Sequence, residues 1–260
     1  MDVAAFTADL VARGIDVVVP CDVRWYNAHV AEHALPLRPL PNFDRPDAMC
    51  LLVGNSSVLW PAFLSWLGAQ PDPASVEDPL DTYTSESITA AVSKLTRGGE
   101  VRHDIFWVYD ARPERLVSMQ RVATTAGVCY HDGETQLAIH PKFGSWLGFR
   151  ACVVVDAPSG LGASPPPPLG CLLSEEEKAA GRAAMAAALR ASDEANLCTQ
   201  LHGAKGMERD VRLAWAALRD VVGIGREHRY SDDQITYHYT KDKALLMRAV
   251  EAHAAARAIL

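Results

Sequence analysis

The sequence predicts an α+β fold with a central, mostly antiparallel sheet flanked by helices and a C-terminal helical cap. Three observations indicate this. Helical and strand patterns alternate through the first 155 residues, four consecutive prolines occupy positions 165–168, and the chain after residue 174 turns helical. A sheet belongs at the centre of such an alternation because each helix must bury its apolar stripe against another layer.

Glycines and apolar runs delimit the elements of the first part of the chain. A helix is expected over residues 3–12, before Gly14, and a longer one over 81–95, before Gly98 and Gly99, because glycine ends helices without steric cost. Pro61 either kinks or starts a further helix. The other expected elements follow from short apolar runs and helical periodicity: strands at 15–19, 49–53, 105–109 and 151–155, and helices at 57–67 and 116–128.

The prolines at 165–168 cannot continue a helix or a sheet, so residues 160–173 are expected to form an extended linker. Two capping boxes follow: Ser174 with Glu177 before a helix over 178–190, and Ser231 with Gln234 before a helix ending at Leu260. We expect three regions: a core at 1–159, the linker, and a cap at 174–260 that contributes to the same site within one structural domain. Residues 179–206 are expected to be lineage-specific.

Composition excludes several classes of protein. The 260 residues carry a net charge of -7, so the basic footprint of a nucleic-acid binder is missing. The sequence contains no apolar run of membrane-spanning length and starts without a basic signal-peptide region, which predicts a soluble, cytoplasmic protein. The cysteines form no Cys-x-x-Cys, which favours reduced thiols over disulfides or a structural metal; they are Cys21, Cys50, Cys129, Cys152, Cys171 and Cys198.

Residues 140–150, which read HPKFGSWLGFR, directly precede the expected strand at 151–155. A His-Pro turn with nearby glycines would let the backbone approach a large flat ligand, while the three rings offer apolar area and Arg150 offers a forked donor for a carboxylate or phosphate. The same composition also suits a tight turn that leads into a core strand, with Arg150 in solvent. His140 is favoured as a turn residue or pocket wall over a general base.

This segment resembles the signature His-Pro-Arg-Phe-Gly-Gly-Trp, with an arginine four residues later, of a cobalamin-processing family. The family comprises the cyanocobalamin reductases / alkylcobalamin dealkylases, also called methylmalonic aciduria and homocystinuria type C proteins. Three further motifs resemble it in the same order over about 210 residues: Trp25-Tyr26-Asn27, Asp78-Pro79-Leu80-Asp81 and Arg229-Tyr230-Ser231-Asp232-Asp233-Gln234. The resemblance implies a nitroreductase-like fold and removal of the upper axial ligand of cobalamin.

The resemblance also implies which residues contact the corrin ring. Gln120 keeps the family's residue, whereas His131, Ala138, Phe149 and Phe106 stand where tyrosine, cysteine, isoleucine and aspartate are usual. The location of the pocket is therefore supported and its detailed contacts are left open. The residues expected to face the corrin are Phe106, Val117, Ser118, Met119, Gln120, His131, Asp132, Gly133, Ala138 and Phe149.

Small residues at 123–127 would offer a flat face on which the corrin ring could lie. Tight packing of a helix against the sheet uses the same small residues, so both interpretations stand. Near the N-terminus, Trp25 and Tyr26 are expected to close the core, with the Tyr26 hydroxyl bonded to a buried polar group.

Removal of an alkyl group requires a thiolate that attacks the carbon bound to cobalt. The resemblance assigns this role to glutathione, whose two carboxylates are held by arginines. Arg150 and Arg219 match two of them, and Lys243 matches a third only if a two-residue gap is allowed. A lysine there would be a point charge rather than a fork, which predicts weaker thiol binding.

Removal of cyanide requires an electron, which the resemblance assigns to reduced FMN or FAD, supplied by a partner reductase or bound in a nitroreductase-like groove. The chain has no Gly-x-Gly-x-x-Gly and so no Rossmann motif of its own. Gln200 stands where the Asp-x-His-x-x-Gly loop of cobalamin mutases would need aspartate before His202, which supports a base-off cobalamin without a protein ligand. A downstream cobalamin-trafficking protein is an implied partner, with the chain a monomer or a ligand-induced homodimer.

Two rival functions remain: a cobalamin chaperone with little turnover, favoured by Lys243 and Ala138, and a nitroreductase-like flavoenzyme with another acceptor. A metal or acid-base cluster of His228, His238 and Tyr239 is disfavoured because their spacing gives no shared helical face.

Overall fold

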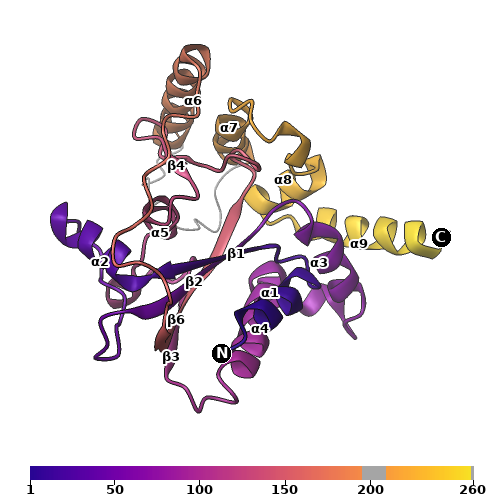
Figure 1. Cartoon of the computed structure of the whole chain (residues 1–260). Helices are drawn as coiled ribbons and strands as arrows, with labels where there is room; N and C mark the ends of the chain where they lie inside the picture. The colour runs from indigo at the N-terminus through magenta and orange to yellow at the C-terminus, as the bar shows by residue number, and fades with distance from the viewer. Residues whose placement is uncertain (195–208, 259–260) are drawn as a thin grey trace.

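The computed structural model describes residues 1–194 and 209–258, and its centre is a four-stranded antiparallel sheet in the order β1-β2-β6-β3 (Figure 1). A two-stranded antiparallel ribbon, β4-β5, forms a second sheet. The predicted fold class is confirmed. The strands are β1 (Val17–Asp22), β2 (Ala48–Asn55), β3 (His103–Trp107), β4 (Tyr130–His131), β5 (Ala138–Ile139) and β6 (Gly148–Pro158).

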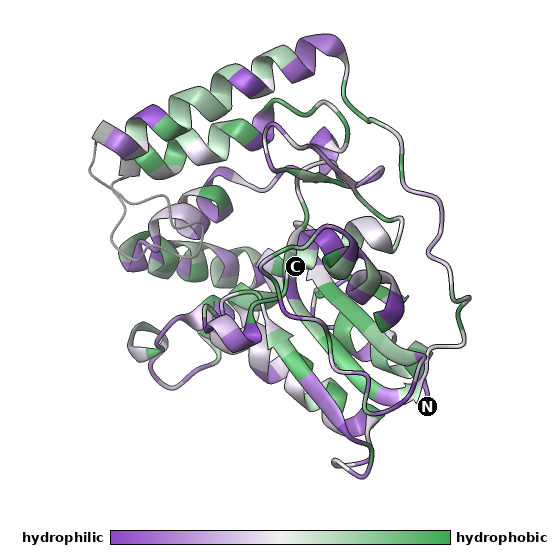
Figure 2. Cartoon of the chain, turned by 90° about the vertical axis from the view of Figure 1, so that its left-hand side faces the viewer, coloured by the Kyte–Doolittle hydropathy of each residue, from purple (hydrophilic) through white to green (hydrophobic). Residues whose placement is uncertain are grey.

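Helices cover both faces of the four-stranded sheet (Figure 1). Alternate residues of β6 belong to two different apolar clusters, Val153 to one and Cys152 to the other. Figure 2 shows the strands as largely hydrophobic, as expected for a sheet that is buried on both sides. The first face is covered by α1 (Val3–Val11), α3 (Leu59–Gly68), α4 (Pro79–Leu95) and α9 (Lys243–Ala258), the second by α2 (Val23–Glu32) and α5 (Met119–Thr125).

The remaining helices follow a segment without helix or strand at 159–174. The Trp25 indole donates to the Gly162 carbonyl at 3.0 Å, and Pro166 packs against Gly127, so this segment crosses the second face of the sheet. After it come α6 (Glu175–Glu194), α7 (Arg209–Asp220) and α8 (Asp232–Thr240), with short 3-10 turns at Pro73–Ser75, Pro113–Arg115 and Arg226–His228.

Both predicted capping residues are in place. Ser174 N–H donates to Glu177 at 2.7 Å and Glu177 N–H donates to Ser174 Oγ at 3.1 Å, which completes the first box. Ser231 Oγ accepts from Gln234 N–H at 3.2 Å. The prediction of one C-terminal helix was wrong, because Lys241 adopts the left-handed conformation with φ 53° and separates α8 from α9.

Other boundaries also differ from the prediction. The helix expected over 116–128 is only α5, since Ser118 caps it and Gly127, with φ +68°, ends it. Helix α2 was not predicted, because its polar residues make the apolar stripe that contains the buried Tyr26 and Val30 hard to recognise in the sequence. As expected, the Tyr26 hydroxyl has a polar partner, the Ser118 N–H at 3.2 Å.

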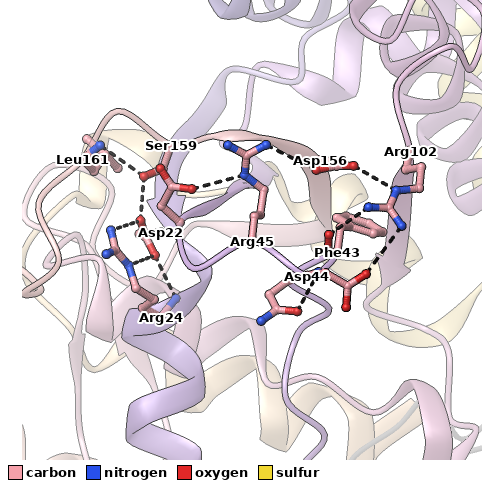
Figure 3. A network of polar contacts seen from close by, with 11 residues as sticks. Asp22, Arg24, Phe43, Asp44, Arg45, Arg102, Asp156, Ser159 and Leu161 are labelled. Atoms are coloured by element: carbon pink, nitrogen blue, oxygen red, sulfur yellow. Dashed lines mark hydrogen bonds and ion pairs between the residues drawn. The ribbon is translucent and has the colours of Figure 1, made fainter.

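A network of ion pairs joins the segment before β2 to the end of the sheet (Figure 3). Arg45 pairs with Asp47 at 3.2 Å and with Asp156 at 3.3 Å, and Asp156 also accepts from Arg102 at 2.9 Å. Arginines in this region therefore have carboxylate partners, which distinguishes them from the arginines of the candidate site.

Candidate functional site

The turn that begins at His140 is fixed by its own hydrogen bonds. His140 and Gly144 exchange backbone bonds of 2.9 and 2.8 Å, and His140 Nδ1 accepts from the Lys142 and Phe143 N–H groups at 3.0 and 3.2 Å. Burial, with the charges of Lys142 and His228, lowers the pKa of His140. A neutral imidazole that accepts two backbone bonds is a turn residue, as the sequence favoured.

Gly144 in this turn allows another segment of the backbone to approach closely. A Cβ on Gly144 would overlap the Ile224 carbonyl oxygen, and one on Gly225 would overlap Phe143. Trp146 is fully buried and Phe143 nearly so. The close backbone approach predicted from the glycines is therefore made by the connection after α7, and these two rings are core residues rather than an open ligand surface.

Arg150 is buried at a β-bulge. The register passes from Val53 opposite Ala151 to Gly54 opposite Phe149, so Arg150 is the extra residue of β6. Bulges commonly redirect side chains at functional sites. Its Nε donates to Asn55 Oδ1 at 2.6 Å, and it forms no ion pair with any residue that the structure describes. Burial lowers its pKa, while Asp81 and Tyr230 are near enough to oppose that shift. The solvent-exposed alternative for Arg150 is thus wrong.

Arg219 reaches the same region from α7. Its Nε and Nη2 donate to the Ser145 carbonyl at 2.9 and 2.6 Å, and Ser145 Oγ donates to the Arg219 carbonyl at 2.7 Å. The guanidinium carbon lies 4.5 Å from the Trp146 ring centre and 4.8 Å from that of Tyr230. The Tyr230 hydroxyl donates to the Asn55 carbonyl at 3.5 Å, and the Asn55 side chain accepts from Arg150. The structure therefore brings the two predicted glutathione-binding arginines together.

His238, which is partly exposed, lies near these two arginines. Burial, followed by the charges of Lys241, Arg219 and Arg150, lowers the pKa of His238 well below its ordinary value. It is therefore neutral near pH 7, and the nearby positive charges make it a weak base. A metal cluster of His238 with His228 was disfavoured from the sequence, and His228 indeed lies elsewhere, with its ring 4.9 Å from that of Phe143.

Lys243 lies apart from these groups. It is exposed at the start of α9, and its Nζ donates to the Ala74 carbonyl at 3.4 Å. The lysine whose charge acts on His238 is Lys241.

The residues expected to face the corrin lie together on the second face of the sheet, around α5 and the β4-β5 ribbon, but their exposure differs. Phe106, Val117 and Met119 are buried in the apolar cluster, against which Ala138 and Phe149 pack with partly exposed side chains. The others of the set are Ser118, Gln120 and His131, which are partly exposed, Asp132, which is buried, and Gly133, which is exposed.

Hydrogen bonds shape the exposed part of this region. Gln120 Nε2 donates to the Gln136 carbonyl at 2.8 Å and so joins α5 to the ribbon turn. Asp132 accepts from the Thr135 N–H at 2.9 Å and from its hydroxyl at 2.6 Å, which fixes the turn. Asp132 is therefore a turn-forming residue. At the neighbouring Gly133, no atom lies within 4 Å of where a Cβ would be.

The small residues at 123–127 pack against the protein. Ala123 is fully buried in the apolar cluster, and Gly127 is covered by Pro166 and Pro167. Of the two interpretations left open by the sequence, tight packing is the one that the structure supports.

A cavity of about 680 Å³ lies between the segment before β2 and β3. Phe106 is the one predicted corrin-facing residue that lines it, and the Arg115 guanidinium covers the Phe106 ring at 4.2 Å while Asp104 binds both Arg115 Nη atoms. The cavity is lined by Asn27, Arg38, Pro39, Leu40, Pro41, Asn42, Asp104, Phe106, Glu114 and Arg115.

Residues 1–194 and 209–258 contain neither a candidate metal site nor a candidate membrane-spanning helix. No group of three or more His, Cys, Asp or Glu side chains there is arranged to hold a metal ion. None of the helices in this part of the chain is long and apolar enough to span a bilayer. Gln200 and His202, considered above as a mutase-like loop, lie outside the described residues.

Asn55 and Lys241 are site residues that the sequence did not single out. Asn55 ends a wholly buried strand and carries no motif, so only its bond to Arg150 reveals it. Lys241 lies two residues before Lys243, which the resemblance offered as the third contact.

No family model and no curated protein matches the sequence. Among solved structures, the chain is similar to a C. elegans B12-trafficking protein CblC, described as a human MMACHC homologue: the TM-score is 0.67 at 17% identity, over 94% of this chain and 93% of that one. It is also similar to an epoxyqueuosine reductase solved with a tRNA-Tyr stem loop, with a TM-score of 0.52 at 11% identity, over 90% of this chain and 69% of that one. These likenesses confirm the predicted nitroreductase-like fold.

Proposed function

We propose that this chain processes cobalamin: it binds the base-off form and removes the upper axial ligand. Two independent lines support this. Four sequence motifs resemble one cobalamin-processing family in order, and the fold resembles a B12-trafficking protein over nearly the whole chain. The observation that carries the proposal is that Arg150 of β6 and Arg219 of α7, which the resemblance had assigned to one ligand, are linked through Tyr230. The Arg219 guanidinium lies 4.8 Å from the Tyr230 ring centre, and the Tyr230 hydroxyl donates to Asn55, which holds Arg150.

The thiol co-substrate is proposed to be glutathione, bound through its carboxylates. Arg150 and Arg219 are both buried, and neither pairs with a carboxylate among the residues of known position. Burying a charge without a partner is costly, so such a group favours an anionic ligand. Asn55 uses only the Nε of Arg150, and neither Nη group is hydrogen-bonded to any residue in the described part of the chain, so both can bind the ligand.

For dealkylation, the thiolate attacks the carbon bound to cobalt. A new sulfur–carbon bond forms, the cobalt–carbon bond breaks, and its electron pair stays on the metal as cob(I)alamin. The thiol must first lose its proton to solvent, because the lowered pKa of His238 makes it too weak a base to take it. The neighbouring arginines would stabilise the thiolate.

The corrin is proposed to lie against α5 and the β4-β5 ribbon. Gln120, His131, Gly133, Ala138 and Phe149 offer partly exposed or exposed positions there. Phe106, Val117 and Met119 would support the pocket from beneath, since they are buried. Ser118 and Asp132 would position α5 and the ribbon turn, because their side chains accept hydrogen bonds from the Arg121 and Thr135 N–H groups.

Decyanation needs an electron, which we assign to reduced FMN or FAD on a partner reductase. The 680 Å³ cavity does not fit a stacked flavin ring, because Arg115 already covers Phe106 and is held there by Asp104. No step is therefore placed on a flavin bound in that cavity. A downstream trafficking protein would receive the product in the cytoplasm.

The third carboxylate contact is proposed for Lys243, with Lys241 as the alternative. Lys243 would have to leave the Ala74 carbonyl, whereas the charge of Lys241 already acts on His238. Comparing glutathione affinity in Lys243→Ala and Lys241→Ala decides between them, because only the lysine that binds glutathione should weaken its affinity.

The experiment that tests the function is an absorbance titration of the purified chain into methylcobalamin, followed by glutathione under anaerobic conditions. A base-off spectrum and then cob(I)alamin bands are expected. A base-off shift without thiol reaction would favour the chaperone, and tight flavin binding without corrin binding would favour a flavoenzyme with another acceptor. No spectral shift with methylcobalamin would exclude the cobalamin function.

A further inference from the structure

Tyr230 lies between the two arginines that are assigned to glutathione. Its ring centre is 4.8 Å from the Arg219 guanidinium carbon and 5.4 Å from the Trp146 ring centre. Its hydroxyl reaches the start of β6, where a Cβ on Gly148 would stand 3.2 Å from the hydroxyl oxygen and 3.6 Å from Arg150 Nη2. The ring therefore contacts one arginine, while the hydroxyl and the other arginine approach the same point.

The Tyr230 hydroxyl and the Arg150 guanidinium can both donate to a ligand at this point. The bond from the hydroxyl to the Asn55 carbonyl is 3.5 Å long, whereas strong O–H···O bonds are about 2.7 Å. Asn55 takes only the Nε of Arg150, so Nη2 has no hydrogen bond to a described residue. Tyr230 and Arg150 are buried, but Gly148 and Phe149 beside them are partly exposed. The two donors thus lie just beneath a place where β6 meets solvent.

The chemistry of glutathione says which of its groups meets Tyr230. The thiol belongs to the middle residue of the tripeptide, and the two carboxylates belong to the outer residues. With one carboxylate on Arg150 and the other on Arg219, as in the proposed function, the cysteine of glutathione faces whatever lies between the two arginines. Tyr230 is the residue that links them, so its hydroxyl is the donor nearest to the thiol.

We propose that Tyr230 is a catalytic residue of the dealkylation, whose hydroxyl donates a hydrogen bond to the sulfur of bound glutathione and stabilises the thiolate. A hydrogen bond to an ionised group favours the ionised form, and cationic neighbours favour a thiolate further. The thiol proton goes to solvent, and the hydroxyl keeps its own. The sulfur then bonds to the methyl carbon as the cobalt–carbon bond breaks, and the electron pair of that bond stays on cobalt. This inference rests on the proposed function.

The surroundings of Tyr230 favour a negative charge. Burial and positive charges lower the pKa of His238, so it stays neutral in the pH range where a thiol ionises. Arg229 already pairs with Asp220 and Asp232. The acid that acts on Arg150 is Asp81, and it is outnumbered by cationic side chains. The charged and titratable groups of this region are Arg150, Arg219, His238, Tyr239, Lys241 and Asp81.

The test is the pH dependence of single-turnover dealkylation by the full-length chain, with methylcobalamin and saturating glutathione under anaerobic conditions. Tyr230→Phe keeps the ring beside Arg219 and removes only the hydroxyl. The rate near neutral pH should fall about 10- to 100-fold, the range for a hydrogen bond to a charged group. The pH of half-maximal rate should rise by about one to two units, because the bound thiol loses a donor.

Tyr83→Phe is the matched control. Tyr83 is also buried, and its hydroxyl also donates to a backbone carbonyl, that of Arg13 at 2.7 Å. It packs on the first face of the sheet, in the apolar cluster with Phe63. Its loss should reduce stability and leave the rate and its pH dependence unchanged.

Binding measurements separate a catalytic role from a positioning role. S-Methylglutathione has both carboxylates but no thiol, so it should bind the wild-type chain and Tyr230→Phe with equal affinity, and so should methylcobalamin. If S-methylglutathione affinity fell as much as the rate, the hydroxyl would bind a carboxylate and the proposal would be overturned. A lower rate with an unchanged pH of half-maximal rate would overturn it as well.

A measurement on the wild-type chain does not depend on whether Tyr230→Phe folds. The ultraviolet absorbance of the thiolate gives the pKa of bound glutathione, which should lie below that of free glutathione. Equal values would refute the proposal. If the wild-type chain dealkylates methylcobalamin but the Tyr230 results are negative, this inference fails and the proposed function stands. If the wild-type chain does not react with glutathione at all, the proposed dealkylation and this inference fail together.

Discussion

Ser145 and Arg219 hold each other by three hydrogen bonds: the serine hydroxyl donates to the arginine carbonyl, and two guanidinium nitrogens donate to the serine carbonyl. Both residues are buried. The pair joins the turn before β6 to the end of α7 and fixes the guanidinium beside Trp146. The family that the sequence resembles has glycine where this chain has Ser145, so the hydroxyl is a feature of this chain.

Ser145→Ala should lower the free energy of unfolding by about 1 to 3 kcal/mol, because the buried Arg219 carbonyl loses its side-chain donor. Glutathione affinity should fall as well, since Arg219 is less firmly placed. Thermal or denaturant unfolding and thiol titration measure the two effects. Thr96→Val, which removes a buried hydroxyl bonded to Val92 at 2.8 Å, is the control: it should reduce stability alone. An equal loss of glutathione affinity in both variants would contradict the role of Ser145.

Arg150→Ala should weaken glutathione-dependent dealkylation by roughly 1.5 to 3 kcal/mol, the range for a charge-assisted hydrogen bond, and leave corrin affinity nearly intact. Single-turnover kinetics with methylcobalamin measure the first and absorbance titration the second. Arg102→Ala, which removes a paired arginine of the Figure 3 network, should leave both unchanged. If Arg150→Ala reduced corrin binding as much as thiol use, the assignment of Arg150 to glutathione would be refuted.

Gly144→Ala should destabilise the fold strongly, because it combines a left-handed backbone, φ +55°, with an overlap between the new Cβ and the Ile224 carbonyl. Gly98→Ala separates the two causes: its φ is +72°, but nothing lies within 4 Å of an added Cβ. We expect Gly98→Ala to lower the free energy of unfolding by about 1 kcal/mol through backbone strain alone, and Gly144→Ala to lower it clearly more. If urea unfolding showed equal losses of stability for the two variants, the connection after α7 would be able to move away from the new Cβ at little cost.

Stability should fall as the pH decreases below about 6.5, the ordinary pKa of histidine. The unfolded chain takes up a proton at His238 in that range, whereas the folded chain does so only at the lower pH set by its lowered pKa. His238→Gln should therefore flatten the pH dependence of the unfolding free energy between pH about 6.5 and about 5. His253→Gln, on α9 and bonded to Ser65, is the control. An unchanged slope in His238→Gln would show that His238 titrates alike in both states.

Local chemistry was enough to predict several elements of this fold. Three features were predicted correctly because each depends only on residues close in sequence. They are the Ser174–Glu177 capping box, the end of α4 before Gly98 and the proline-rich linker. Helix α2 and the break at Lys241 were missed because neither is marked by a local pattern: one depends on the core that α2 covers, the other on how α8 and α9 pack.

The candidate site divides in the same way. Resemblance in sequence pointed to Arg150, Arg219 and Gln120, but it could not show that a bulge turns Arg150 toward Asn55. It also could not show that Ile224 fills the space at Gly144.

By itself, the sequence determined the α+β class, the main caps and turns, and the motifs that suggest cobalamin chemistry, because these depend on side-chain type and near neighbours. Only the tertiary structure decided that Arg150 and Arg219 are buried near Tyr230 without an ion pair to a described carboxylate. The physical reason is that burial and charge pairing between distant segments depend on how the helices pack onto the two faces of the sheet, which no local pattern encodes.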